Sequence, residues 1–263
     1  MEIIEASSLF VSEPNPYMFG NPNNKVNKYW TNNNWLKSRF HFSFAEYRDR
    51  NRSGFDSMLV MNDDLVQPER GFGTHPHSNM EIVTYVVNGE LTHRDSTGNQ
   101  ESLGRGSIQF MSAGKGLMHS ESNEHTTDPC RFIQMWFLPR TNGLDVRYGS
   151  FDGIVGNAQE KRRNKWFHMV SDISKGFETP VKLHQDVNLF VAELDSGNTL
   201  EFEVKHGRSL YALVIETVDG DTIIGGKKLK QHSAIKISQP GSIPFISPTK
   251  GRSHILIVDQ KRQ

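Results

Sequence analysis

The sequence predicts an all-β protein that contains two similar barrels in tandem. Three observations lead to this prediction. Short runs of β-branched and aromatic residues alternate with turns rich in Gly and Asn, a pattern that is typical of sandwiches and barrels. No long segment keeps the period of an amphipathic helix. The second half also repeats the first weakly, since residues 85–89 resemble 214–220 and residues 106–114 resemble 232–241.

The first half opens with an irregular segment and continues as strands. Residues 13–34 are heavy in Asn and Pro, which indicates an irregular surface segment, and the aromatic stretch 30–44 begins a strand of the first domain. Asn88-Gly89 is a strong hairpin signal, so we expect residues 81–87 to pair with residues 90–94. Further strands are predicted at residues 107–111, around His119, and at residues 131–138.

A stretch punctuated by glycines separates the two predicted barrels. It covers residues 140–165 and ends in a basic run that we interpret as solvated surface. Strands resume at residues 187–194, 199–204 and 209–216. The expected domains are therefore an N-terminal barrel at residues 1–140, a connector at 141–165 and a C-terminal barrel at 166–263.

Composition limits the class of protein. Thirty basic residues balance thirty acidic ones, so charge favours no direct contact with nucleic acid. Cys130 is the only cysteine, which excludes an intrachain disulfide and a thiolate metal site. Residues 1–5 do not resemble a signal peptide, and no apolar run reaches the roughly 18 residues of a membrane helix. We expect a cytoplasmic protein without membrane contact, and a nuclear location would also fit a eukaryotic source.

Two short segments carry the side chains of a candidate metal site. Alternate residues of a strand share a face, so His75 lies beside His77, and His119 lies beside Glu121. Two such pairs on neighbouring strands would place three imidazoles and a carboxylate around one divalent transition metal. Four protein ligands would saturate tetrahedral zinc, whereas six-coordinate iron(II) or manganese would keep two positions for substrate and dioxygen. Iron(II) is our first choice.

Glu81 is an alternative carboxylate. It lies four residues after His77, so on an ideal strand it would share that histidine's face. It could replace Glu121 as a ligand, or it could hydrogen-bond a histidine or pair with a cation. Residue spacing favours Glu121 without excluding Glu81. Four apolar residues are candidate walls of a substrate pocket, or else ordinary barrel core: Phe72, Met80, Phe110 and Trp136.

Residues 71–85, GFGTHPHSNMEIVTY, and residues 111–121, MSAGKGLMHSE, resemble the motifs of the pirin family in the cupin superfamily. The resemblance is specific over roughly residues 35–140 and weaker towards the C-terminus. It implies two cupin (jelly-roll-like) β-barrels in tandem, with metal only in the N-terminal barrel. It also implies iron ligands at His75, His77, His119 and Glu121, and therefore no ligand role for Glu81.

The resemblance implies two functions. One is cleavage of a flavonol or similar enol-ketone with O2, as in quercetin 2,3-dioxygenases, where Glu121 would be the catalytic base for the substrate hydroxyl. The alternative is a non-enzymatic iron-binding protein that senses redox state and acts on transcription through a protein partner. A purely stabilising metal is a third interpretation. Ser78-Asn79 stands where pirin has a basic residue after His-Pro-His, so contacts at the rim of the site are expected to differ.

Overall fold

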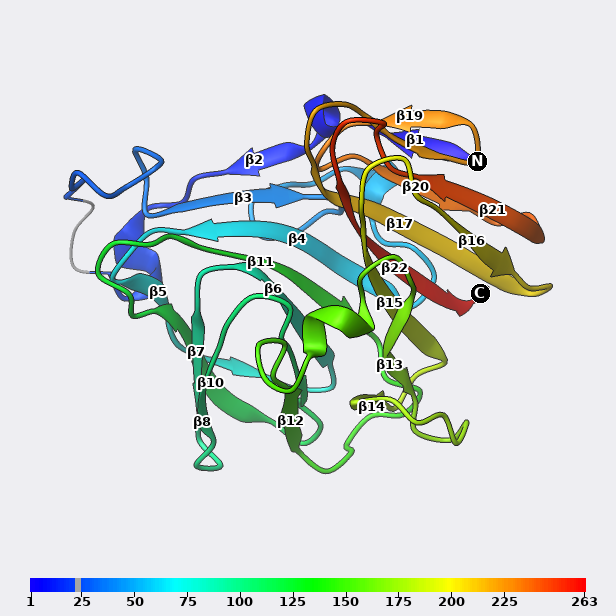
Figure 1. Cartoon of the computed structure of the whole chain (residues 1–263). Helices are drawn as coiled ribbons and strands as arrows, with labels where there is room; N and C mark the ends of the chain where they lie inside the picture. Colours follow the sequence, from blue (N-terminus) through cyan, green and yellow to red (C-terminus); the bar gives the residue numbers. More distant parts are fainter. Residues whose placement is uncertain (22–24) are drawn as a thin grey trace. The chain divides into compact units, whose positions relative to one another are not determined.

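The computed structural model describes residues 1–21 and 25–263 (Figure 1). The chain forms two compact units. The N-terminal unit contains Phe10–Gly54 and Met58–Gly156, and the C-terminal unit contains Met1–Leu9, Phe55–Ser57 and Asn157–Gln263. Three of the residues expected in the irregular Asn- and Pro-rich segment, 22–24, lie outside the described residues. None of the helices described is long and apolar enough to cross a membrane.

The N-terminal unit consists of a seven-stranded and a four-stranded antiparallel sheet. The strand order is β12-β9-β6-β11-β4-β3-β2 in the larger sheet and β5-β10-β7-β8 in the smaller one. The strands are β2 (Phe10–Ser12), β3 (Leu36–Phe40), β4 (Met58–Val66), β5 (Arg70–His77), β6 (Glu81–Asn88), β7 (Leu91–Asp95), β8 (Gln100–Leu103), β9 (Ile108–Ser112), β10 (Leu117–Asn123), β11 (Cys130–Phe137) and β12 (Arg147–Phe151). Short 3-10 helices η2 (Pro16–Phe19) and η3 (Arg50–Arg52) belong to the same unit.

The C-terminal unit repeats this architecture. Its sheets have the orders β1-β20-β17-β22-β15-β13-β14 and β16-β21-β18-β19. The strands are β1 (Glu2–Ile4), β13 (Phe167–Asp172), β14 (Val181–Leu183), β15 (Val187–Leu194), β16 (Thr199–Val204), β17 (Arg208–Thr217), β18 (Thr222–Ile224), β19 (Lys227–Leu229), β20 (Ala234–Ile237), β21 (Gly241–Ile246) and β22 (Ser253–Lys261). The 3-10 helices η1 (Ala6–Ser8) and η4 (Ala158–Lys161) complete it. The predicted all-β fold with two similar domains is confirmed.

The boundaries of the units differ from the expected residue ranges at three places. Phe55–Ser57 belong to the C-terminal unit, although they lie within the range expected for the N-terminal barrel. The first nine residues belong to the C-terminal unit, because β1 pairs with β20 and so extends the sheet of that unit. The expected connector is divided between the units, because β12 pairs with β9 in the N-terminal unit while η4 begins the C-terminal one. The differences at the N-terminus and in the connector come from strand pairings between residues far apart in the sequence.

The predicted hairpin at Asn88-Gly89 is wrong. β6 pairs with β9 and β11, whereas β7 pairs with β8 and β10 in the other sheet. Gly89 has a φ of 73°, and a Cβ at this position would lie 2.4 Å from the carbonyl oxygen of Pro129. The glycine is therefore needed for a tight passage of the chain from one sheet to the other. A turn signal predicts a local reversal of the chain, but it does not decide which strands pair.

The core of the N-terminal unit is built by both of its sheets. One buried cluster contains side chains from both sheets. Phe132 comes from the seven-stranded sheet, and Trp35 directly precedes β3 of that sheet. Leu91 and Leu103 come from the four-stranded sheet. The free thiol of Cys130 is buried in the same cluster. This core holds the two sheets together and so fixes the side chains that project between them.

Candidate metal centre

The histidine cluster is assembled by the pairing of β5 with β10. In this antiparallel register His119 lies opposite His75, and Leu117 lies opposite His77. Alternation along β5 places both of its histidines on the face that His119 also occupies. The register shifts between His119 and Glu121, so that Glu121 lies opposite Phe72. Such an irregularity re-aims the side chains on either side of it.

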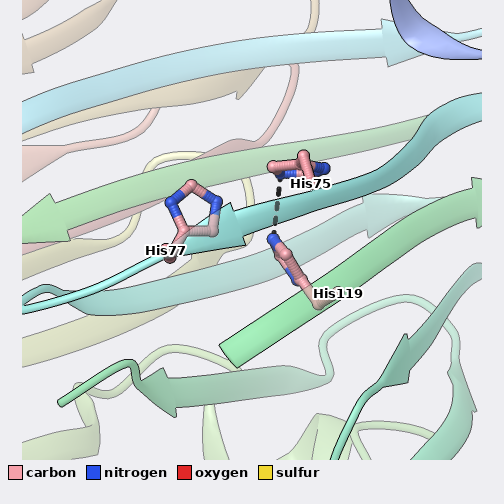
Figure 2. A group of neighbouring side chains, drawn as sticks. All are labelled: His75, His77 and His119. Carbon is pink, nitrogen blue, oxygen red and sulfur yellow. Dashed lines mark hydrogen bonds between the residues drawn. The ribbon is translucent and has the colours of Figure 1, made fainter. Parts of the chain in front are cut away.

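The three imidazole rings converge, as Figure 2 shows. The Nε2 atoms of His75 and His119 are 3.1 Å apart, and the potential ligand nitrogens of all three histidines lie within 4.8 Å of one another. Two nitrogens that bind one ion at right angles, each at ~2.1 Å, would be ~3.0 Å apart. The spacing of the two Nε2 atoms therefore fits adjacent positions around a six-coordinate ion.

The protonation of the histidines also fits a metal. Burial, together with the neighbouring histidines, lowers the pKa of His77 to about 4 and that of His119 to about 3. Both rings are therefore neutral at physiological pH and keep a lone pair for coordination. The Nδ1 of His75 is 2.7 Å from the carbonyl oxygen of Gly73. Donation of the Nδ1 proton to that oxygen leaves the Nε2 of His75 free to bind.

Glu121 lies beside the histidines but is held by amides. Its side chain is buried, and its two oxygens accept hydrogen bonds from the Nε2 atoms of Gln109 at 2.8 Å and Gln134 at 2.7 Å. The carboxylate forms a second group with His93 and His119, with ligand atoms within 4.8 Å. The four expected ligands thus fall into two overlapping groups that share His119. Glu121 nevertheless lines the same cavity as His75 and His77.

Glu81 is placed differently from what its spacing suggested. β5 ends at His77 and β6 begins at Glu81, with Asn79 at a φ of 50° in the turn between them. The interpretation of His77 and Glu81 as one strand is therefore wrong, and the His-x-His segment lies at the end of β5. Glu81 is buried and accepts a hydrogen bond from Ser112 at 2.8 Å. Among the described residues, it belongs to neither of the two groups of side chains that could hold a metal ion.

His93 was not anticipated from the sequence. It lies on β7, is buried, and its ring stacks on Tyr148 with centroids 4.6 Å apart. Its Nδ1 is 3.5 Å from the Nδ1 of His119, and its Nε2 is 3.2 Å from Oδ2 of Asp95. Although burial opposes it, hydrogen bonds from Asn99, Thr97 and His93 hold the pKa of Asp95 well below its usual range. The His-x-Asp spacing at 93–95 was the available signal.

One assignment of protons satisfies every contact of this chain of side chains. The Asp95 carboxylate accepts the Nε2 proton of His93, and the Nδ1 of His93 accepts the Nδ1 proton of His119. The Nε2 of His119 then keeps its lone pair, which faces His75. Histidines that bind metals usually donate their other ring proton in this way, which fixes the tautomer and the orientation of the ring.

A cavity of about 350 Å³ opens onto His75, His77 and Glu121. This volume lies within the range of small-molecule sites. The Trp136 ring stands edge-on to His77, with centroids 4.8 Å apart. Five aromatic side chains line the cavity: Phe19, Phe40, Phe44, Phe72 and Trp136. Two of the predicted wall residues, Phe72 and Trp136, are thus among them, whereas Met80 packs against a separate apolar cluster and Phe110 lines a small neighbouring void.

Two domains of this architecture, with a histidine cluster on the smaller sheet of the first, define a two-domain cupin with a candidate metal centre. The pirin family model matches residues 23–137, and a model described as the quercetinase C-terminal cupin domain matches residues 160–259. A quercetin 2,3-dioxygenase from Escherichia coli K12 is 36% identical over 230 residues, which cover 87% of this chain and 93% of the relative. The chain belongs to the pirin family.

Other relatives agree with this assignment. A pirin-like protein from Caulobacter vibrioides is 36% identical over 177 residues, which cover 67% of this chain and 74% of that protein. The crystal structure of the bacterial pirin YhhW from Escherichia coli in complex with nickel(II) superposes with a TM-score of 0.81 at 29% identity, covering 100% of this chain and 99% of that one. A metal-bound relative and the histidine cluster together indicate a single metal ion at this site.

Proposed function

We propose that the protein is an iron-dependent dioxygenase that opens the ring of a flavonol or a similar enol-ketone, as a quercetin 2,3-dioxygenase does. The observation that carries this proposal is the aromatic-walled cavity that opens onto His75, His77 and Glu121. A flat aromatic substrate would pack against its walls with its polar edge towards the histidines. The names of the relatives support the same reaction class.

His75, His77, His119 and Glu121 would hold one divalent ion. Three neutral nitrogens and one carboxylate suit a first-row transition metal. Bound iron(II) would lower the pKa of a coordinated substrate hydroxyl and keep the substrate beside dioxygen. In the net reaction both atoms of O2 enter the organic product, and carbon monoxide leaves the opened ring.

Glu121 would move the proton of the substrate hydroxyl. The proton passes from the hydroxyl oxygen to a carboxylate oxygen, which requires the two atoms to lie within hydrogen-bond distance. Oε1 of Glu121 accepts from the Gln109 amide and from the Thr84 hydroxyl, whereas Oε2 accepts from the Gln134 amide and keeps another lone pair. These amides hold the carboxylate in one orientation, so the base is positioned before the substrate arrives.

The proposal is tested by loading the protein with iron(II) under anaerobic conditions and then measuring oxygen uptake with quercetin. We expect uptake with release of carbon monoxide, and a loss of at least about 100-fold in His119→Ala, since the variant loses a ligand. Tight iron binding without uptake or carbon monoxide release would overturn quercetinase activity. That result would favour the alternative of an iron-binding protein that acts through a partner.

A further inference from the structure

A polar stripe crosses the wall of the cavity away from the histidines. Gln134 on β11 lies opposite Asn62 on β4, and Asp64, two residues further along β4, lies opposite Ser38 on β3. Alternation places Asn62 and Asp64 on the same face of the sheet. All four residues line the cavity, together with its five aromatic side chains and with further polar residues such as Glu46 and Thr74. Buried polar groups in such a wall require hydrogen-bond partners.

Asn62 has no such partner. It is 3% exposed, and its Oδ1 is buried without a hydrogen bond. Among residues 1–21 and 25–263, neither end of its amide bonds to another side chain or to the backbone. Its neighbour Gln134 differs, since that amide donates to Glu121 and accepts from the indole of Trp136. A buried amide with both its donor and its acceptor open is incomplete without a ligand or water.

Asp64 supplies a second open group. Ser38 donates a hydrogen bond to its Oδ1. Burial, together with the nearby Asp63 and Glu121 carboxylates, raises the pKa of Asp64 to about 8, although the hydrogen bond from Ser38 acts in the opposite direction. The side chain is therefore mainly a neutral acid at pH 7 and offers an O–H donor. Together, the Asn62 amide and the acid of Asp64 can donate to and accept from the same hydroxyl group.

We propose that Asn62 and Asp64 form a subsite for a phenolic hydroxyl of the substrate, distinct from the hydroxyl that meets Glu121. The phenol O–H donates to Oδ1 of Asn62, while its oxygen accepts from the Asn62 amide or from Asp64. The inference rests on the proposed function and narrows its substrate class. The natural substrate is a flat aromatic enol-ketone that carries at least one further hydroxyl on its framework.

The subsite is tested with two probes that share the enol-ketone. Quercetin carries additional phenolic hydroxyls, and 3-hydroxyflavone carries none. Each is titrated anaerobically into the iron-loaded wild type and into Asn62→Leu, with binding followed through tryptophan fluorescence. Leucine has a similar volume and removes an unpaired amide, so the variant is expected to fold and to unfold at an equal or higher temperature. The iron content of both proteins is measured, because Asn62 is not a proposed ligand.

We expect wild type to bind quercetin more tightly than 3-hydroxyflavone. In Asn62→Leu the affinity for quercetin should fall roughly five- to tenfold, while the affinity for 3-hydroxyflavone stays the same. Phe40→Leu is the matched control, since Phe40 lies opposite Asn62 on β3 and lines the same cavity. It should weaken both probes to the same degree. Asn62→Ala repeats the test if the leucine variant misfolds.

Two results would contradict the proposed subsite, and they have different consequences for the proposed function. If wild type binds and turns over both probes with the preference unchanged by Asn62→Leu, the subsite is wrong and the proposed function stands. In that case an ordered water molecule hydrogen-bonds to the Asn62 amide. A lower unfolding temperature of Asn62→Leu would agree with a structural role of that water-bound amide. If wild type binds neither probe, the subsite and the proposed function both fail.

Discussion

At the scale of residues, His119 links the two groups of the centre, because each of its ring nitrogens faces a different histidine. Its Nε2 faces His75, and its Nδ1 faces His93. The orientation of a metal ligand is set by the hydrogen bond on its other nitrogen. His93 is therefore expected to matter for metal binding although it need not touch the ion.

This expectation gives a prediction for His93→Phe. The phenyl ring can still stack on Tyr148, but it cannot accept the Nδ1 proton of His119. We expect the dissociation constant for nickel(II), measured by calorimetry, to rise roughly 10- to 100-fold without a large loss of stability. His93→Gln offers a carbonyl acceptor and should recover part of the affinity. The exposed His125 provides the control, since His125→Ala should bind as wild type does. Equal affinity of His93→Phe and wild type would contradict the proton assignment.

At the scale of elements, the close approach of β5 and β10 sets the distance between the histidines. A Cβ on Gly71 would lie 2.4 Å from the carbonyl oxygen of Glu121 and 2.5 Å from the Cα of Ser122. Only glycine allows the two backbones to approach this closely. The glycine therefore contributes to the centre through its backbone, although it is four residues before His75.

Gly71→Ala is accordingly expected to weaken metal binding by roughly tenfold or more. The reason is that β5 and β10 must separate, which moves the Nε2 atoms of His75 and His119 apart. Gly73→Ala is the matched control on the same strand. Its Cβ would lie 3.1 Å from the carbonyl oxygen of Phe19, a tighter contact than usual but one that does not involve β10. Calorimetric titration with nickel(II) should rank wild type, Gly73→Ala and Gly71→Ala in falling affinity. A reversed order of the two variants would show that this approach does not control the site.

The same elements explain what the sequence could predict. The strands at 187–194 and 199–204 were placed at their observed bounds, because runs of β-branched and aromatic residues bounded by turns are local signals. The proximity of His75, His77 and His119 also followed from alternation along strands. The pairing of residues 81–87 with 90–94 was wrong, because the choice of partner strand depends on distant residues. His93 was missed for the same reason, since only the fold brings β7 beside β10.

At the scale of the whole molecule, the two domains share an architecture but fill their smaller sheets differently. In the C-terminal unit, β16 pairs with β21 much as β5 pairs with β10. Leu200 lies opposite Phe245, and Phe202 lies opposite Ile243, and all four belong to or pack against the apolar core. Hydrophobic side chains thus occupy the counterpart of the histidine strands. The two groups of side chains that could hold a metal ion, among the described residues, both lie in the N-terminal unit.

Metal should therefore stabilise one domain and not the other. A ligand that binds only the folded state lowers the population of locally open forms around its site. We expect nickel(II) to slow amide hydrogen exchange in peptides that cover β5 and β10, and to leave peptides from β15, β17 and β22 unchanged. His119→Ala should abolish the protection, which would exclude nonspecific binding at the surface. Equal protection of both domains would contradict a single centre, because the sheet of β16 and β21 offers hydrophobic side chains in place of ligands.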